Sequence, residues 1–194
     1  MTEDEKLLVR RAQGGDAEAF QALYERHLRR IYNISWRMMG NAADAQDMAQ
    51  ESMLKAWRAL PRFKLDSAFG TWLYRIAVNA CSDELRRRRA KFVSMEQLAE
   101  VGHEPGCEGF EERTVTGDSI QQAILQLQEE YRAAVVLRDV EGYAYEDIAS
   151  ILQCPMGTVR SRISRGREQL RALLTQDGTL PREATSNQAE RGRT

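Results

Sequence analysis

The chain has 194 residues, of which 42% are hydrophobic and 29% charged, and its formal net charge is −1. This composition is typical of a globular protein with one large or two small domains, and the net charge by itself excludes no class of partner. Three scattered cysteines and two histidines, without CxxC spacing, argue against a disulfide framework or a metal site. We expect no cofactor and no small-molecule substrate.

The N-terminus and the hydropathy pattern predict a soluble cytoplasmic protein. No apolar run reaches the ~18 residues that a transmembrane helix needs, so we expect no insertion into a membrane. The acidic N-terminal stretch MTEDEK does not resemble a signal peptide.

Residues 1–92 are predicted to form a compact bundle of four helices, because apolar residues recur three and four positions apart. Thr2 and Glu5 form a capping box at the start of the first helix, and Asp16 can cap the second. Pro61 ends the third helix. The breaks between the helices are Gly14-Gly15, Gly40-Asn41 and the loop of residues 62–70.

After this bundle, residues 93–118 lack helical periodicity and carry many acids, which predicts a flexible linker. Helical spacing then resumes. The predicted segments are a helical stretch at 119–139, a short helix at 145–152, a tight turn at 153–155, a last helix at 156–174 and a disordered tail at 175–194. The predicted fold class is therefore all-α, with two small helical domains joined by a flexible acidic linker.

Charge is unevenly distributed along the chain. Residues 55–92 contain ten basic and three acidic residues, and residues 156–174 contain five basic residues and one acidic residue. Residues 93–118 between them contain one basic and seven acidic residues. Two basic patches that flank an acidic stretch indicate a nucleic-acid-binding protein, although the net charge is close to zero.

The last predicted helix has one apolar face and one basic face at the α-helical periodicity. The apolar stripe consists of Met156, Val159, Ile163, Gly166, Leu170 and Leu173. The opposite face carries Arg160, Ser161, Ser164 and Arg165. A short helix, a three-residue turn and this helix form a helix-turn-helix, whose second helix enters the DNA major groove, where arginine can contact guanine. The alternative is a solvated basic helix end.

Aromatic and basic residues alternate in and after the loop of residues 62–70. They are Arg62, Phe63, Lys64, Phe69, Trp72, Tyr74 and Arg75. Aromatic rings can stack on unpaired bases, and cations follow the phosphate backbone. Asn79, one helical turn past Arg75, can hydrogen-bond a base edge, and the arginines at 86–89 can hold phosphates. Trp72 is equally compatible with the core, whereas an aromatic residue within the loop is less easily explained as core.

The helix predicted before Pro61 has an acidic outer face. Asp44, Asp47 and Glu51 recur three and four positions apart, with Gln50 beside them. Such a stripe suits a protein partner that presents arginines. The alternative is an ordinary solvated helix face.

Two long blocks resemble the extracytoplasmic-function (ECF) sigma factors of bacterial RNA polymerase, and within them the sigma-E/AlgU-like subgroup. DMAQESMLKAWRALPRFKLDSAFGTWLYRIAVNA (47–80) looks like region 2, and LRDVEGYAYEDIASILQCPMGTVRSRISRGREQL (137–170) looks like region 4. The resemblance implies that 1–92 form region 2 and 119–174 form region 4. It also implies a factor that is not an enzyme, that binds promoter DNA and the clamp and flap of core RNA polymerase, and that an anti-sigma factor controls.

The resemblance implies roles for individual residues. Core polymerase is expected to be bound by Asp47, Gln50 and Glu51. The minus-10 element is expected to be recognised and melted by Phe63, Lys64, Asp66, Ser67, Ala68, Trp72, Tyr74, Arg75 and Asn79. The minus-35 element is expected to be read, partly through its shape, by Arg160, Ser161, Ser164 and Arg165.

The chain departs from the family pattern at four places. Leu65 and Gln153 stand where relatives have glycine. Ser164 stands where relatives often have a large aromatic residue, and Leu127-Gln128 replaces a frequent Leu-Pro. Both blocks still resemble the family regions despite these changes.

Two other functions are compatible with parts of the sequence. One is a stand-alone helix-turn-helix regulator that binds a duplex operator as a dimer, which requires neither the aromatic loop nor the acidic stripe. The other is an enzyme that uses Cys81, His27 or His103. A nucleophile needs a positioned base, but His27 is expected on a polar helix face and His103 in the linker.

Overall fold

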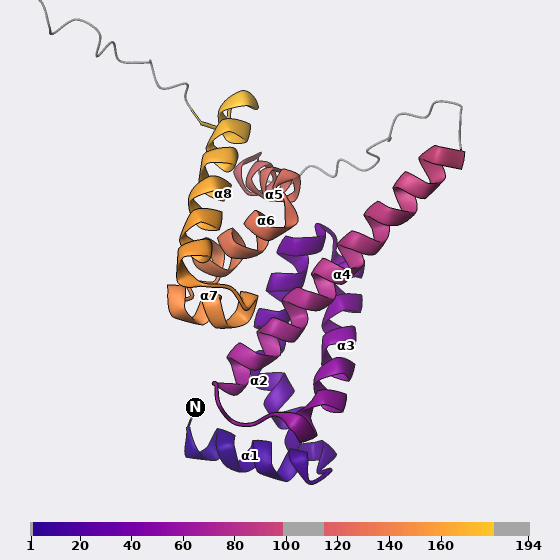
Figure 1. Cartoon of the computed structure of the whole chain (residues 1–194), viewed down its shortest axis with the longest axis vertical. Helices are drawn as coiled ribbons and strands as arrows, with labels where there is room; N and C mark the ends of the chain where they lie inside the picture. The colour runs from indigo at the N-terminus through magenta and orange to yellow at the C-terminus, as the bar shows by residue number, and fades with distance from the viewer. Residues whose placement is uncertain (1, 99–114, 181–194) are drawn as a thin grey trace, which may run out of the picture.

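The computed structural model describes residues 2–98 and 115–180, and within these ranges every regular element is helical (Figure 1). The all-α fold class is therefore confirmed. The elements are α1 Glu3–Gln13, α2 Ala17–Met39, α3 Ala42–Ala59, the 3-10 turn η1 Leu60–Arg62, α4 Phe69–Leu98, α5 Val115–Gln126, α6 Glu129–Val135, the π-helical turn η2 Val136–Val140, α7 Tyr145–Leu152 and α8 Met156–Gln176. Most of the predicted linker, and the tail beyond residue 180, lie outside the described residues.

Side-chain caps start the first three helices. The Thr2 hydroxyl accepts a hydrogen bond from the Glu5 amide at 3.2 Å, and the Asp16 carboxylate caps α2 in the same way. The cap at Asp16 is as predicted. Of the predicted capping box only the bond to the Thr2 hydroxyl is present, since the Glu5 carboxylate lies 3.3 Å from Nε2 of His27. Asn41 caps α3, since its side-chain oxygen accepts from an amide of the first turn at 2.8 Å. Each cap satisfies an amide that has no partner within its helix.

Several helix boundaries differ from the sequence prediction, and α8 ends at Gln176, two residues past its predicted end. α4 continues to Leu98, past the predicted end of the bundle, because the residues after Phe92 include good helix formers that hold a helix without an apolar stripe. α5 begins at Val115, inside the predicted linker, and the predicted helical stretch of 119–139 is divided among α5, α6 and η2. The break occurs at Leu127, whose carbonyl accepts from the buried Arg132 side chain at 3.1 Å.

α7, the turn of residues 153–155 and α8 form the predicted helix-turn-helix. The Cys154 amide donates to the Ala149 carbonyl at 3.2 Å, which closes the turn. Gly166 allows α8 to approach α6, because an added Cβ would lie 2.5 Å from Cγ2 of Val135. The small residue in the apolar stripe is therefore required by the packing of these two helices.

Among the residues that the structure describes, two other than glycine have left-handed backbone conformations. Leu65 has a φ of 59° and Gln153 has a φ of 50°. These are the two positions at which the resemblance stated from the sequence implies glycine, which adopts this conformation without strain. For other residues the left-handed conformation costs about 1–2 kcal/mol, so the chain retains the turn geometry at some cost in stability.

Gln153→Gly is expected to raise the free energy of unfolding by about 0.5–1 kcal/mol, because glycine avoids the clash of Cβ with the following carbonyl. Gln153 is exposed, so the substitution removes no buried contact. Urea denaturation measures the change. The control, Gln122→Gly at an exposed position inside α5, is expected to lower stability by about 1 kcal/mol. A destabilised Gln153→Gly variant contradicts this explanation.

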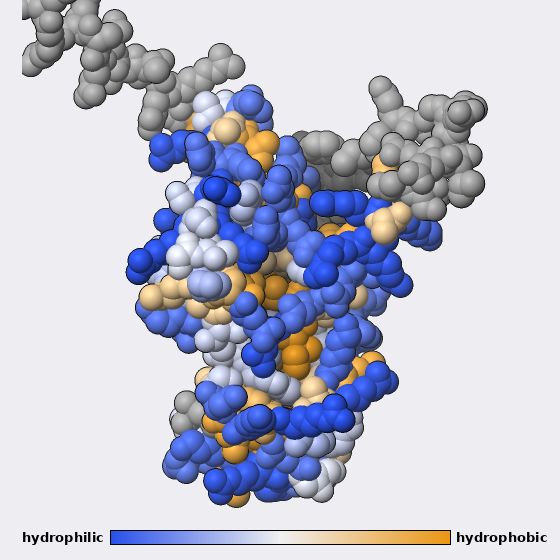
Figure 2. All heavy atoms as spheres, viewed as in Figure 1, coloured by the Kyte–Doolittle hydropathy of each residue, from blue (hydrophilic) through white to orange (hydrophobic). Residues whose placement is uncertain are grey.

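The N-terminal unit (α1–α4) and the C-terminal unit (α5–α8) pack against each other. α7 lies against α4 and α5 lies against α2, as Figure 1 shows. Buried residues of both units belong to one hydrophobic cluster. On the face drawn in Figure 2, hydrophilic residues cover most of the surface, and hydrophobic residues gather in the middle, where the units meet.

Candidate nucleic-acid interface

The outer face of α8 presents the four residues predicted to read the minus-35 element. Arg160, Ser161, Ser164 and Arg165 are all exposed. Val159, Ile163 and Gly166 are buried on the opposite side. Met156, predicted to belong to the apolar stripe, is instead 38% exposed, because α8 begins at this residue and its packed face begins one turn later.

Two other arginines of α8 pair with carboxylates of the same unit. Arg162 lies 2.8 Å from Glu130, and Arg167 lies 2.5 Å from Asp139. These ion pairs relieve part of the repulsion between closely spaced arginines. The cations of α8 that best suit contacts with an external polyanion are therefore Arg160 and Arg165.

Tyr145, which sequence reasoning missed, supports this face from the first turn of α7. The guanidinium carbons of Arg138 and Arg160 lie 4.7 Å and 6.0 Å from the centre of the Tyr145 ring. An aromatic ring attracts cations at these distances, so Tyr145 positions Arg160 beside α7. The two residues belong to different helices, and no periodic pattern in the sequence connects them.

The aromatic residues of the predicted minus-10 segment are buried. Phe63, Trp72 and Tyr74 are only 5%, 7% and 3% exposed. The rings of Phe63 and Trp72 stack with centres 4.8 Å apart, and Phe69 packs beside both. The expectation that a loop aromatic is not core is therefore wrong for Phe63 and for the fully buried Phe69. In this conformation these rings support the loop from below and offer no face on which a base can stack.

The polar residues of the loop lie on the outside. Lys64, Asp66 and Ala68 are exposed and Ser67 is half-buried. Nε2 of Gln13, in α1, donates to the carbonyls of Leu60 and Phe63 at 3.1 and 2.7 Å. Sequence reasoning did not identify Gln13, because an isolated glutamine has no diagnostic pattern. Its two hydrogen bonds hold the backbone at the start of the loop, so the loop residues begin from a fixed position.

The arginine run at 86–89 is less available for phosphates than predicted. The guanidinium of Arg88 donates two hydrogen bonds of 2.6 Å to Asp44 and one of 2.7 Å to Glu84. These bonds are the main reason that the pKa of each carboxyl is lowered. Arg88 therefore ties α4 to α3, while Asn79, nearer the start of α4, is exposed as expected.

The free energy of unfolding is expected to fall between neutral and acid pH. In Arg88→Ala this fall is expected to be smaller by about 0.5–1 kcal/mol, the range of a partly exposed ion pair. Because the fold lowers the pKa of Asp44 and Glu84, their stabilisation is present above their ordinary pKa of about 4 and is lost as the pH falls through the lowered values. Urea unfolding at neutral and at acid pH measures this loss. Arg89→Ala is the control, and an Arg88→Ala variant with the wild-type pH dependence contradicts the assignment.

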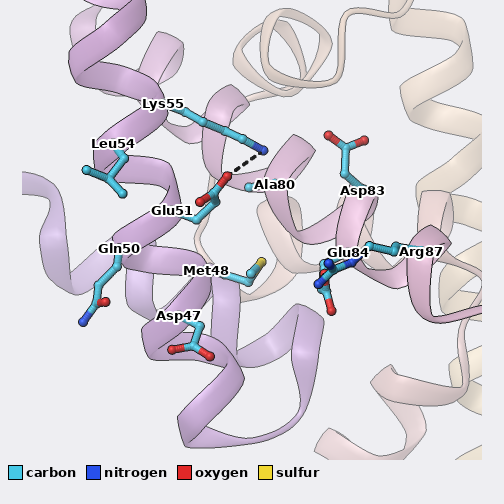
Figure 3. A pocket seen from close by; sticks show the side chains of 10 residues that line it. All are labelled: Asp47, Met48, Gln50, Glu51, Leu54, Lys55, Ala80, Asp83, Glu84 and Arg87. Atoms are coloured by element: carbon cyan, nitrogen blue, oxygen red, sulfur yellow. Dashed lines mark hydrogen bonds and ion pairs between the residues drawn. The ribbon is translucent and has the colours of Figure 1, made fainter.

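A groove of about 480 Å³ lies between α3 and α4 (Figure 3). Its acidic and amide lining consists of Asp47, Gln50, Glu51, Asp83 and Glu84. Lys55 and Arg87 also line it, and they lie 3.4 and 2.5 Å from Glu51 and Glu84. Leu54 adds an apolar side chain that is 50% exposed. The three predicted residues thus lie together, and α4 contributes two carboxylates that the sequence prediction placed in a basic segment.

The side chains proposed for an enzyme are poorly placed for catalysis. Cys81 is fully buried, and burial raises the pKa of its thiol to about 11, so the reactive thiolate does not form at neutral pH. His27 is not on an open polar face as predicted. Its Nδ1 lies 2.5 Å from the Tyr74 hydroxyl, and its Nε2 lies 3.3 Å from the Glu5 carboxylate. His103 lies outside the described residues.

Family comparisons match both units of the chain. The family model described as Sigma-70 region 2 matches residues 23–91, and the model described as Sigma-70, region 4 matches residues 117–170. The RNA polymerase sigma-H factor of Pseudomonas aeruginosa is 43% identical over 178 residues, which cover 87% of this chain and 92% of that protein. The chain belongs to the ECF sigma factors of the sigma-70 family.

Further relatives agree with this assignment. The ECF RNA polymerase sigma-E factor of Salmonella typhimurium is 38% identical over 176 residues, which cover 86% of this sigma factor and 92% of the relative. The solved structure of the sigma factor RpoE of Bartonella quintana, in complex with the anti-sigma factor NepR, matches with a TM-score of 0.66 and 26% identity, covering 83% of this chain and 99% of that one. A stand-alone regulator is not favoured, because region 2 is matched together with region 4.

The resemblance inferred from the two sequence blocks is thereby confirmed, and with it the role of this sigma factor in transcription initiation. The matched ranges include every residue predicted to contact core polymerase or promoter DNA. Within the described residues of the sigma factor, no helix combines the length and the apolar character needed to cross a membrane.

Proposed function

We propose that this sigma factor binds core RNA polymerase through the groove between α3 and α4 and reads its promoters with two separate surfaces. The minus-10 surface is the exposed loop with the start of α4, and the minus-35 surface is the outer face of α8. The factor performs no chemistry itself and acts in the cytoplasm, where nucleotide addition belongs to the polymerase. Residues 1–92 and 119–174 are the working domains, joined by the linker of 93–118.

The groove carries the proposal for core polymerase. Asp47 and Glu51 of α3 face a space that Asp83 and Glu84 complete from α4 (Figure 3). Carboxylates on two walls can receive arginines in bidentate pairs, which combine charge with fixed geometry. The groove has four carboxylates against two cations, Lys55 and Arg87, and this excess of negative charge disfavours nucleic acid there. A basic protein helix with an apolar residue against Leu54 is the partner that fits.

The loop and α4 support the proposal for the minus-10 element. Lys64 and Asn79 are exposed and carry donors for phosphates or base edges. Asp66 can accept from a base amino group. Phe63 and Trp72 hold the loop in place as a stacked pair. Extruding a base from the duplex costs a few kcal/mol of free energy, and binding of that base by a preformed loop can offset this cost.

The exposed face of α8 supports the proposal for the minus-35 element. Arg160 and Arg165 are both exposed and lie five residues apart on α8, with Ser161 and Ser164 between them. The hydroxyl of Ser161 donates to the Thr158 carbonyl at 2.9 Å, so it presents its oxygen as an acceptor. Two arginines and two short polar side chains give few base-edge contacts, which leaves a large share of recognition to DNA shape.

We also propose an anti-sigma factor as a partner. The Bartonella quintana sigma factor was solved with one, and its similarity to this chain extends over both units. Purification of the tagged sigma factor from its native host, followed by mass spectrometry, tests for this partner. A sigma factor recovered only with core polymerase under all growth conditions contradicts this part of the proposal.

The proposal is tested by binding experiments with the purified chain. We expect it to elute with core RNA polymerase that lacks a sigma factor, and to bind a forked promoter probe tightly only in that complex. The free chain is expected to bind duplex DNA weakly at physiological salt. Tight and specific binding of duplex DNA by the free chain, without binding to core polymerase, would instead identify a stand-alone regulator.

A further inference from the structure

α1 lies beside η1, from which the loop with the proposed minus-10 residues leads to α4 (Figure 1). At the start of this loop, Nε2 of Gln13 donates to the carbonyls of Leu60 and Phe63 at 3.1 and 2.7 Å. An amide nitrogen carries two hydrogens, so one side chain can satisfy both acceptors. Gln13 therefore joins the first residue of η1 to the residue that follows this turn.

The other end of the loop is held by a second residue of α1, which acts through His27 of α2. Nε2 of His27 lies 3.3 Å from the carboxylate of Glu5, and Nδ1 lies 2.5 Å from the hydroxyl of Tyr74 in the second turn of α4. An ionised carboxylate can only accept, so Nε2 donates to Glu5 and Nδ1 accepts from Tyr74. Burial lowers the pKa of His27, which keeps the ring neutral at pH 7 and preserves this arrangement.

Gly70 allows the first turn of α4 to pack directly on this pair of side chains. An added Cβ at Gly70 would lie 3.0 Å from Cε1 of His27 and 3.1 Å from Cε2 of Tyr74. The ring of Phe69 also packs near His27, with the ring centres 5.6 Å apart. The start of α4 is thus fitted to His27, and His27 is bound in turn to α1.

The middle of the loop has a strained backbone. Leu65 has a φ of 59°, which is unfavourable for a residue with a Cβ. Such a conformation persists only where the surrounding structure holds it. Lys64 and Asp66, on either side of Leu65, are exposed, and the directions of their side chains depend on this backbone. The position of the proposed base-contacting groups therefore depends on how firmly the two ends of the loop are held.

We propose that α1 holds this loop in its base-binding shape from both ends, through Gln13 at the start and through Glu5 and His27 at the end. The three are positioning residues for selection of the minus-10 element, and none of them is exposed. Glu5 and Gln13 precede residues 23–91, which match region 2. A loop held at both ends loses less conformational freedom on binding an extruded base, and it adapts less readily to a wrong base. This inference rests on the proposed minus-10 role of the loop.

The test separates positioning of the loop from stability of the fold. Gln13→Ala removes both hydrogen bonds at the start of the loop. His27→Leu removes the acceptor of Tyr74, whereas His27→Asn places an oxygen near the position of Nδ1. The control is Ile34→Val, since Ile34 is fully buried in α2 about two turns beyond His27, and its substitution lowers stability by a similar amount.

Each variant is bound to core polymerase and transcribes a host promoter fragment that the wild type uses. The minus-10 region of this fragment is randomised, and each template carries a barcode downstream of the start site. Sequencing of the transcripts gives the preference for the best over the worst base at the most selective position. Circular dichroism verifies that each variant is folded, and titration measures its affinity for core polymerase.

We expect Gln13→Ala and His27→Leu each to reduce this base preference at least about fivefold, the effect of one lost hydrogen bond. Affinity for core polymerase is expected to change less than about twofold, because the groove between α3 and α4 lies elsewhere. His27→Asn should retain more of the preference than His27→Leu. Ile34→Val should retain all of it, because a smaller folded fraction lowers the yield from every template equally.

An unchanged preference in a folded Gln13→Ala or His27→Leu variant overturns the inference. So does an equal loss in Ile34→Val, or a His27→Asn variant as impaired as His27→Leu. A wild-type factor without any minus-10 preference would contradict the proposed function itself, which distinguishes the two failures.

Discussion

Asp47→Arg/Glu51→Arg is expected to weaken binding of the sigma factor to core RNA polymerase at least about a hundredfold, because two carboxylates that receive cations become cations. Both residues line the groove between α3 and α4 (Figure 3). Neither is buried in the free chain, so the fold is expected to be retained. Titration of labelled sigma factor into sigma-free core polymerase measures the affinity, and transcription should be lost in parallel.

The matched control for this prediction makes the same charge change elsewhere. Glu3→Arg/Glu18→Arg alters two exposed acids on α1 and α2, away from the groove, and is expected to change the affinity less than about threefold. Equal losses in both variants would mean that the overall charge of the domain, and not the groove, determines core binding. Unchanged affinity after the groove substitution would remove the groove from the interface.

Arg160→Ala/Arg165→Ala is expected to reduce transcription from promoters that depend on a minus-35 element by about 10²–10³-fold, because each bidentate arginine contact is worth about 1–3 kcal/mol of discrimination. Both guanidinium groups are exposed on α8, so little loss of stability is expected. Binding of the variant to core polymerase should remain unchanged. Transcript yield is measured from promoters with the matched minus-35 sequence and from promoters with base substitutions in that element.

Arg171→Ala is the matched control on the same helix. Arg171 is exposed but lies beyond the turn that carries the proposed recognition residues. We expect its loss to affect all promoters slightly and equally, as for a contact with a phosphate. If the double variant also loses activity equally on matched and substituted minus-35 sequences, Arg160 and Arg165 bind the backbone and do not read bases.

Much of the local structure could be predicted from the sequence, because it depends on neighbouring residues. The caps at Thr2 and Asp16 follow from side chains within one turn, and the bounds of α7 agree with the predicted range of 145–152. The burial of Val159, Ile163 and Gly166 on α8 follows from periodicity, whereas Leu170 and Leu173 are only half-buried and Met156, at the first position, is exposed. The four residues on the opposite face of α8 were correctly predicted to be exposed for the same reason.

Contacts between residues distant in sequence could not be predicted. Phe63 was expected to be available for stacking, but it has Trp72 and Phe69 as neighbours and belongs to the core. Arg88 was expected to bind phosphate, but Asp44 lies opposite it on α3. A run of arginines has the same sequence whether acids face it or not, and only the packing of the helices decides between these outcomes.

The relative placement of the two units is the largest feature absent from the sequence reasoning. The buried Arg132 and Gln121 bridge to carbonyls and side chains at the end of α2, and neither residue stands out in a helical pattern. A single polar residue on an otherwise apolar helix face is compatible with solvent, a ligand or another domain. In the structure, Arg132 and Gln121 contact the other unit, and these contacts hold the two units together.

The most direct measurement is run-off transcription by core RNA polymerase that lacks any sigma factor, with the purified chain and pooled genomic promoter fragments from its host. We expect discrete start sites that appear only when the chain is added and that share two elements at a constant spacing. Transcripts from the Asp47→Arg/Glu51→Arg variant should be absent. No chain-dependent transcript, together with tight binding of the free chain to duplex DNA, would contradict the assignment of this protein as a sigma factor.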